Sequence, residues 1–248
     1  MAALRASETM MRQFLLLALL VVAAAARADE TAIRKAAEAL LADGAKVEAV
    51  SSAGFLGLFE VRLSTPEGAR ILYTDENGTY FFVGTVIDGK TQTDITEARL
   101  RKLNAIRFED LPLAQAFKIV RGKGTRQLAY FADPRCPYCR KFDQELTQVD
   151  DVTVHVFLIP IIAPDSAAIS KAVWCSPDRA KAWLDLMLNG VQPAAKTSCD
   201  TPIEKNLALS RKYGINGTPT LIFADGQRVS GWMPAARLSK MLTDAAKR

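Results

Sequence analysis

The chain has 248 residues, and its 32 Lys and Arg against 27 Asp and Glu give a formal net charge of +5. This length allows one or two domains, and the small charge does not indicate binding of nucleic acid, because no basic run with interleaved aromatic residues accompanies it. All four cysteines lie after residue 135, so any thiol chemistry belongs to the second half of the chain.

Residues 1–28 have the pattern of a secretory signal peptide. Arg5 and Arg12 precede an apolar run over residues 14–25, and Ala26-Arg27-Ala28 then matches the small-x-small cleavage pattern. The run is short for a bilayer-spanning helix, which disfavours the alternative of a retained membrane anchor. We therefore predict an exported mature protein that starts at Asp29 and works in an oxidising compartment, where disulfides persist.

The next segment, residues 29–93, has the pattern of a small helix-plus-antiparallel-sheet unit without cysteine or histidine. Apolar residues at helical spacing predict a helix over residues 31–41. Strands are expected over residues 58–63, 71–74 and 79–86, the last two joined by an Asn77-Gly78 hairpin turn. A small sheet with exposed edges gains by pairing with a second copy, so we predict a dimerisation domain. A monomeric accessory domain is the alternative.

Residues 94–112 are expected to form a linker helix. Asp94, followed three residues later by Glu97, has the pattern of a helix-capping pair. The stretch is rich in charge and lies between two segments rich in predicted strands. It therefore favours a connector that sets the distance between the two halves of the chain.

The catalytic candidates are Cys136 and Cys139, in the sequence Cys136-Pro137-Tyr138-Cys139. An apolar run over residues 128–132 predicts a buried strand before them, and residues 140–146 predict a helix after them. Side chains three apart on a first helical turn share a face, so the two sulfurs can form a disulfide. The positive end of the helix favours the Cys136 thiolate, which is the form that attacks disulfides. Pro137 suits a helix-opening position.

Two other interpretations of this cysteine pair are a zinc site and an inert structural disulfide. Zinc needs further ligands, usually from a second close pair, whereas Cys175 and Cys199 lie far apart in the sequence. The one histidine, His155, falls on a predicted strand over residues 152–160, where a structural role is expected. We therefore predict no metal and no cofactor.

The second domain is expected over residues 113–248. Further strands are predicted over residues 117–120 and 221–223, and a final helix over residues 235–246. Residues 167–209 are helical in pattern and contain Cys175 and Cys199, which in an exported protein most simply form a structural disulfide; a second redox couple is the alternative. Pro219, after Gly217-Thr218 at a strand start, is a candidate for a cis peptide bond.

Taken in order, these elements resemble a thioredoxin-fold domain with a helical insertion, and the whole chain resembles the DsbC/DsbG family of periplasmic thiol:disulfide isomerases, with the DsbC branch nearer. The resemblance implies an α+β chain with a cystatin-like N-terminal dimerisation domain, a linker helix and a V-shaped homodimer. It implies that Cys136 is the nucleophile and Cys139 the resolving thiol, that Thr218 and a cis Pro219 flank the sulfurs, and that Cys175 and Cys199 form the structural bridge.

The expected function is a thiol:disulfide isomerase or reductase that rearranges incorrect disulfides in misfolded exported proteins. By the same resemblance, a membrane reductase of the DsbD type would keep the dithiol reduced. The dipeptide Pro137-Tyr138 is of the DsbG kind, where many DsbC proteins carry Gly-Tyr, and it bears on the balance of isomerase and oxidase activity. The alternatives are a DsbA-type dithiol oxidase, a chaperone with an incidental dithiol, and a DsbG-like reductase that protects single cysteines.

Overall fold

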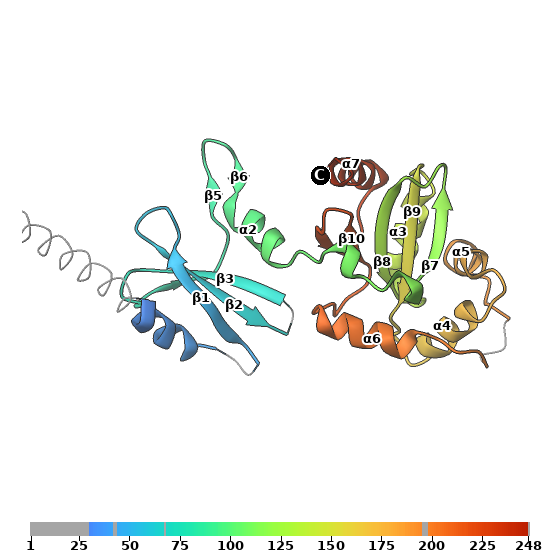
Figure 1. Cartoon of the computed structure of the whole chain (residues 1–248), viewed down its shortest axis with the longest axis horizontal. Coiled ribbons are helices and arrows are strands. Elements are labelled where there is room, and N and C mark those ends of the chain that lie inside the picture. Colours follow the sequence, from blue (N-terminus) through green and yellow to red (C-terminus); the bar gives the residue numbers. More distant parts are fainter. Residues whose placement is uncertain (1–29, 42–43, 67, 195–197, 248) are drawn as a thin grey trace, which may run out of the picture. The chain divides into compact units, whose positions relative to one another are not determined.

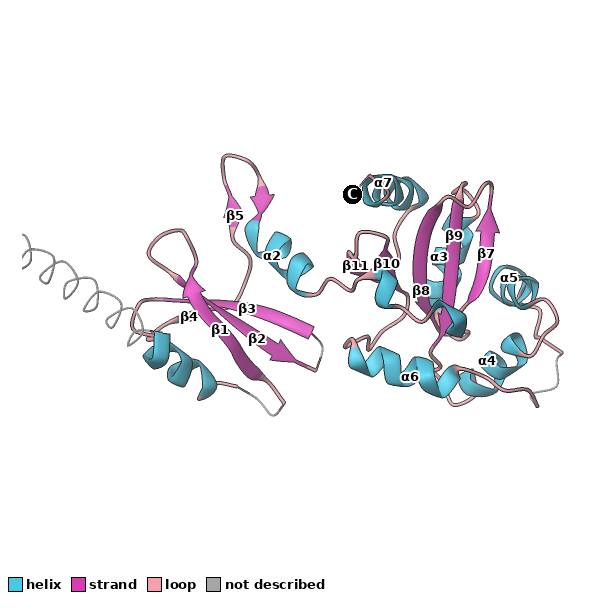
Figure 2. Ribbon diagram, viewed as in Figure 1, coloured by secondary structure: helices cyan, strands magenta, loops and turns pink. Residues whose placement is uncertain are grey.

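The computed structural model describes residues 30–41, 44–66, 68–194 and 198–247. The chain divides into two compact units, with the boundary between Leu100 and Arg101. Both units mix helices and strands, as the predicted α+β class requires (Figures 1 and 2). The predicted signal peptide lies outside the described residues. Within those residues, no helix is long and apolar enough to cross a membrane.

The N-terminal unit packs a helix over residues 30–38 against a four-stranded antiparallel sheet. The strands follow one another in chain order: β1 (Lys46–Ser52), β2 (Phe59–Thr65), β3 (Gly68–Thr74) and β4 (Phe81–Phe82). Ile33 and Ala37 on the helix pack with Val47, Val61 and Leu63 of the sheet. This core confirms the predicted helix and places β2 and β3 where the alternation of apolar residues indicated strands.

Strand β1 was not predicted, because a bulge hides its alternation. The pairing of β1 with β2 shifts register between Val47 and Ala49. The extra residue moves Val50 to the buried side three positions after Val47, a spacing that does not match the period of two expected for a strand.

The turn at Asn77-Gly78 forms as predicted, but the strand after it is shorter than expected. Gly78 has φ +67°, and a Cβ atom there would lie 3.2 Å from the backbone of Ile33, so the turn favours glycine on both grounds. The backbone N–H groups of Thr79 and Tyr80 donate to Asp75 Oδ1, both at 2.8 Å, instead of joining the sheet. The predicted strand over residues 79–86 is therefore reduced to β4, and a small hairpin of β5 (Ile87–Asp88) and β6 (Thr93–Asp94) follows.

The expected linker helix is present only in part. Helix α2 (Ile95–Leu103) begins after Asp94, whose Oδ1 accepts the N–H of Glu97 at 2.7 Å, as the capping pattern indicated. The predicted extension to residue 112 is wrong. The N–H of Ile106 donates to the carbonyl of Gly226 at 3.0 Å and its side chain is buried, so the chain leaves the helix there to join the core of the C-terminal unit. The division of the chain into domains over residues 29–93, 94–112 and 113–248 stays a prediction.

The C-terminal unit is built on a five-stranded sheet with the order β11-β10-β8-β9-β7. Strands β8 and β9 are parallel and the other neighbours are antiparallel. The strands are β7 (Phe117–Arg121), β8 (Arg126–Ala132), β9 (Val152–Leu158), β10 (Thr220–Phe223) and β11 (Arg228–Ser230). All seven residues of β9 are buried, as expected for a strand covered on both faces.

Helices cover both faces of this sheet, and the side chains of β8 alternate between them. Leu128, Tyr130 and Ala132 pack in the same cluster as residues of α3 (Pro137–Leu146), α5 (Arg179–Asn189) and α7 (Ala235–Ala245). Phe131 packs in the opposite cluster, where residues of α6 (Ile203–Lys212) lie. The predicted helical insertion consists of α4 (Ser166–Trp174), α5 and α6. The first turn of α3 therefore begins just beyond the end of a buried central strand.

Candidate functional site: a dithiol at the start of a helix

Cys136 is the N-cap residue of α3. Its backbone has extended dihedral angles, φ −75° and ψ 117°, and Pro137 follows within the first helical turn. The Cys136 Sγ atom accepts a hydrogen bond from the backbone N–H of Cys139 at 3.3 Å. An N-cap side chain normally satisfies a free N–H of the first turn, and here a sulfur takes that place. The reactive atom is thus held where the helix presents positive partial charge.

The two thiols of this pair differ strongly in acidity. The pKa of Cys136 is lowered to about 6 by its interaction with the Cys139 thiol, helped by the Thr218 side chain and by backbone N–H groups of Cys139 and Tyr138, against the opposing effect of burial. The pKa of Cys139 is raised far above the usual value, first by burial and then by the neighbouring Cys136. At neutral pH the pair therefore carries one thiolate, on Cys136, and one thiol, on Cys139.

The loop before β10 lies against the dithiol. The peptide bond between Thr218 and Pro219 is cis. The Cys136 thiol donates to the carbonyl oxygen of Thr218 at 3.1 Å. The Thr218 hydroxyl is buried, and no described residue meets the distance and angle of a hydrogen bond with it. It is nevertheless close enough to the Cys136 sulfur to lower the pKa of that thiol. The structure therefore brings the predicted residues Thr218 and Pro219 to the sulfur.

The remaining predicted site residues lie as follows. The Tyr138 ring is exposed, with the Lys141 Nζ atom 5.5 Å from its centroid. Cys175 and Cys199 form a disulfide with a Cα–Cα distance of 5.7 Å, at the C-terminal end of α4. His155 is buried on β9, where its Nε2 atom lies 2.9 Å from Gln127 Oε1. Among the described residues, no group of three His, Cys, Asp or Glu side chains could hold a metal ion.

The sequence predictions missed a buried carboxylate, Asp133, which holds the loop that leads to Cys136. Its Oδ1 atom accepts from the N–H of Arg135 at 2.7 Å and from the Ser166 hydroxyl at 2.8 Å. Its Oδ2 atom accepts from the N–H groups of Ile161 and Ile162 at 2.7 and 2.8 Å. Its position after a buried strand and before a proline was the available signal.

A second buried acid, Asp143, lies behind the dithiol and was also missed. It is fully buried and accepts from Trp183 Nε1 and from the Tyr130 hydroxyl, both at 3.2 Å. The same hydroxyl lies 3.3 Å from the carbonyl oxygen of Cys139. Burial raises the pKa of Asp143 to about 7. The signal was an acid next to Phe142 on the apolar face of the predicted helix, four residues after Cys139.

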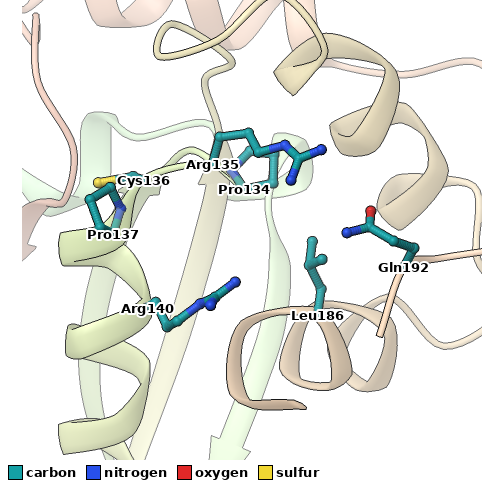
Figure 3. A pocket seen from close by; sticks show the side chains of 7 residues that line it. All are labelled: Pro134, Arg135, Cys136, Pro137, Arg140, Leu186 and Gln192. Carbon is teal, nitrogen blue, oxygen red and sulfur yellow. The ribbon is translucent and has the colours of Figure 1, made fainter. Parts of the chain in front are cut away.

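A pocket of about 210 Å³ opens beside Cys136 (Figure 3). It is formed by the loop before α3, the first turn of α3, the buried face of α5 and the segment after α5. The residues that line it are Pro134, Arg135, Cys136, Pro137, Arg140, Leu186 and Gln192. Because these residues come from segments far apart in the sequence, no local pattern indicated the pocket.

Comparison with known proteins agrees with this geometry. Residues 113–246 match the thioredoxin-like domain, and residues 24–97 match the N-terminal domain of the disulfide bond isomerase protein. The probable thiol:disulfide interchange protein DsbC of Bordetella pertussis is 42% identical over 186 residues, which is 75% of this chain and only 65% of that protein. The thiol:disulfide interchange protein DsbC of Escherichia coli K12 is 28% identical over 229 residues, 90% of this chain and 91% of that protein.

A solved structure supports the assignment of the C-terminal unit. The crystal structure of a disulfide interchange protein from Neisseria gonorrhoeae superposes with a TM-score of 0.53 at 40% sequence identity, covering 55% of this chain and 99% of that one. The two domain matches and these relatives confirm the resemblance and the predicted fold class, a thioredoxin-like domain preceded by a separate N-terminal domain. The chain therefore belongs to the DsbC family of thiol:disulfide interchange proteins.

Proposed function

We propose that the protein is a thiol:disulfide isomerase and reductase that rearranges incorrect disulfides in exported proteins. The observation that carries this proposal is the position of the Cys136 Sγ atom at the N-cap of α3, where it accepts the N–H of Cys139 at 3.3 Å beside the buried Cys139 thiol. In this position the pKa of Cys136 is lowered to about 6, whereas burial raises the pKa of Cys139. Only a thiolate attacks a disulfide, so this arrangement supports Cys136 as the nucleophile and Cys139 as the resolving thiol.

The reaction then proceeds by thiol–disulfide exchange. The Cys136 thiolate attacks one sulfur of a wrong disulfide, forms a mixed disulfide and releases the other substrate sulfur as a thiolate. If that thiolate attacks another disulfide of the substrate and the substrate finally displaces Cys136, the substrate is isomerised with no net electron transfer. If Cys139 instead attacks Cys136, its proton ends on the departing substrate sulfur, the enzyme dithiol is oxidised and the substrate is reduced.

The surroundings of the dithiol offer contacts for an unfolded substrate chain. The carbonyl of Thr218 becomes available to a substrate N–H when the Cys136 proton is lost. Exposed apolar side chains lie on the segments that form the site: Tyr138 two residues after Cys136, Ile161 and Ile162 on the loop bound to Asp133, and Trp232 next to Gly231, whose N–H donates to the Pro219 carbonyl. Such a rim suits chains with exposed apolar residues.

The N-terminal unit is proposed to form a homodimer. Strand β4 is at the edge of its sheet, and Phe82 on this strand and Val83 just after it are 52% and 85% exposed. Apolar residues on an unpaired edge favour pairing with a second copy. We also assign the mature protein to the periplasm, from the signal-peptide pattern, and infer that a membrane reductase of the DsbD type returns the dithiol to its reduced form.

The direct test is the reactivation of a protein with scrambled disulfides. We expect the mature protein to raise the yield of native substrate and Cys136→Ala to abolish this activity. Cys139→Ala should still form mixed disulfides but release them more slowly. A yield unchanged by Cys136→Ala would instead indicate a chaperone with an incidental dithiol. Thiol trapping in cells distinguishes the proposed isomerase from a DsbA-type oxidase. An oxidised Cys136 at steady state would indicate the oxidase.

A further inference from the structure

We propose that the pocket beside Cys136 is a subsite for a carboxylate carried by the bound disulfide substrate, close to its reacting cysteine. This inference rests on the proposed function, since it concerns which disulfides the same dithiol prefers. The pocket, of about 210 Å³, is several times larger than the space of about 30 Å³ that one water occupies, so a side chain fits in it. Cys136 itself forms part of its wall.

The direction of the side chains separates this pocket from the reacting sulfur. In Figure 3 the Cys136 sulfur points away from Leu186, whereas the side chains of Arg140 and Gln192 both extend toward Leu186. A substrate sulfur bonded to Cys136 would therefore stay outside the pocket. A group from a neighbouring position of the substrate can enter it.

The charge of the lining favours an anion. Among the residues that line the pocket, Arg135 and Arg140 are cationic and none is Asp or Glu. The Cys136 thiolate loses its charge when it forms the mixed disulfide with the substrate. Arg135 is already neutralised, because its Nε atom lies 3.1 and 3.0 Å from the two carboxylate oxygens of Asp165. The Arg140 side chain has no hydrogen bond or ion pair with any described residue. One guanidinium with free donors therefore remains to bind the substrate.

The shape of the lining favours a carboxylate on a short apolar stem. Leu186 is 2% exposed and supplies an apolar floor, and Pro134 and Pro137 supply apolar walls. The planar guanidinium of Arg140 can bind both oxygens of a carboxylate. The amide of Gln192, which also has no side-chain partner among the described residues, can donate one further hydrogen bond. A lysine in the same place would be repelled by Arg140.

The experiment measures how fast the reduced full-length mature protein forms mixed disulfides with two kinds of small disulfide. The first arm uses disulfide-linked peptides that differ only in one residue next to the cysteine, which is Glu, Gln or Lys. The second arm uses oxidised glutathione and its ester, in which the carboxylates are blocked and the amino groups are unchanged. Exposed ion pairs contribute up to about 1 kcal/mol, so we expect the protein to prefer the Glu peptide over the Gln peptide by about two- to fivefold, and less in high salt.

Arg140→Gln should bring this preference close to one, and Arg140→Glu should reverse it in favour of the Lys peptide. Arg237→Gln, which removes an exposed arginine on α7, is the matched control and should keep the preference. The pH dependence of Cys136 alkylation should change little among the four proteins, because Arg140 is not among the main groups that lower the pKa of Cys136. If the pH profile shifts in step with the loss of the Glu preference, Arg140 acts through the acidity of Cys136 and not through the pocket. That result would overturn the proposal.

The two arms identify the source of the carboxylate. Loss of preference in the peptide arm assigns the subsite to acidic side chains of polypeptide substrates, and loss in the glutathione arm assigns it to small thiols. A preference for Glu that survives Arg140→Gln in the peptide arm, together with an unchanged glutathione ratio, overturns the proposal. Failure of the unmodified protein to react with any of these disulfides, including the Gln peptide, would count against the proposed function itself.

Discussion

The carbonyl oxygen of Thr218 lies 3.1 Å from the Cys136 Sγ atom, although 82 residues separate them in the chain. The Thr218 hydroxyl is buried beside the same sulfur, and no described residue forms a hydrogen bond with it. Burying a hydroxyl without a partner costs stability. The Thr218 hydroxyl therefore links the loop before β10 to the ionisation of Cys136 rather than to the stability of the fold.

Replacing that hydroxyl tests this link. In the unmodified protein, the rate of Cys136 alkylation should rise with pH around the thiol pKa of about 6, well below the range of an ordinary cysteine. Thr218→Val removes a group that lowers this pKa, so the profile should move to higher pH. The free energy of unfolding should change by no more than about 1 kcal/mol, because no formed hydrogen bond is lost.

Thr220→Val is the matched control for this change. The Thr220 hydroxyl donates to the carbonyl of Gly217 at 2.8 Å and is not among the main groups that lower the pKa of Cys136. This variant should lose about 1 kcal/mol of stability and leave the alkylation profile in place. Equal shifts in the two profiles would contradict a specific role for Thr218.

The buried acid Asp143 should make the stability of the fold fall as pH rises. Its pKa is about 7 in the folded protein and about 3.9 in an unfolded chain, so between these values the folded state holds a proton that the unfolded state has lost. The free energy of unfolding therefore decreases across this window, by up to about 4 kcal/mol at 1.36 kcal/mol for each pKa unit.

Asp143→Asn removes this titration while keeping a side chain of similar size. Urea unfolding of the reduced proteins at pH 5 and pH 8 should show a loss of stability with pH that is about 2–3 kcal/mol smaller in the variant. Asp151→Asn serves as the control, because the pKa of this partly exposed carboxyl is lowered. Its titration therefore affects stability only at pH values below about 4, outside the range from pH 5 to pH 8. Parallel pH profiles for the unmodified protein and Asp143→Asn would refute the assignment.

The disulfide between Cys175 and Cys199 should contribute to stability and not to exchange chemistry. It closes a loop with a sequence separation of 24, and constraining such a loop in the unfolded chain is worth about 3 kcal/mol. Replacing both cysteines with Ala should lower the free energy of unfolding by about that amount. Alkylation of Cys136 should keep its pH dependence, and a shift in that dependence would revive the alternative of a second redox couple.

The edge strand β4 should hold the proposed homodimer together. Replacing Phe82 and Val83 with Lys puts charge on an apolar edge and should raise the dissociation constant of the dimer at least about tenfold, which corresponds to about 1.4 kcal/mol. Sedimentation at several concentrations measures this shift. Val120→Lys changes a residue of the C-terminal unit that is 59% exposed, and it should leave the dimer unchanged. Equal dissociation constants for all variants would exclude β4 from the interface.

Much of the dithiol region could be predicted from the sequence because its geometry is local. A buried strand, the order Cys136-Pro137-Tyr138-Cys139 and a following helix depend on backbone preferences and on residues a few positions apart. The capping of α2 by Asp94 and the turn at Gly78 are local in the same sense. The extent of the linker helix could not be predicted in this way, because it depends on a distant segment. Helix α2 ends at Leu103, and the N–H of Ile106 donates to the carbonyl of Gly226.

By itself, the sequence determined which residues can carry thiol chemistry, since spacing along one strand and one helix was enough to pair Cys136 with Cys139. Only the tertiary structure decided the surroundings of that pair. The packing of Asp143 against Trp183, the hydrogen bonds of Asp133 to Ile161 and Ile162, and the pocket that Arg140 forms with Leu186 and Gln192 each join segments that are distant in the chain. Burial and electrostatic fields depend on such packing, and no local pattern specifies it.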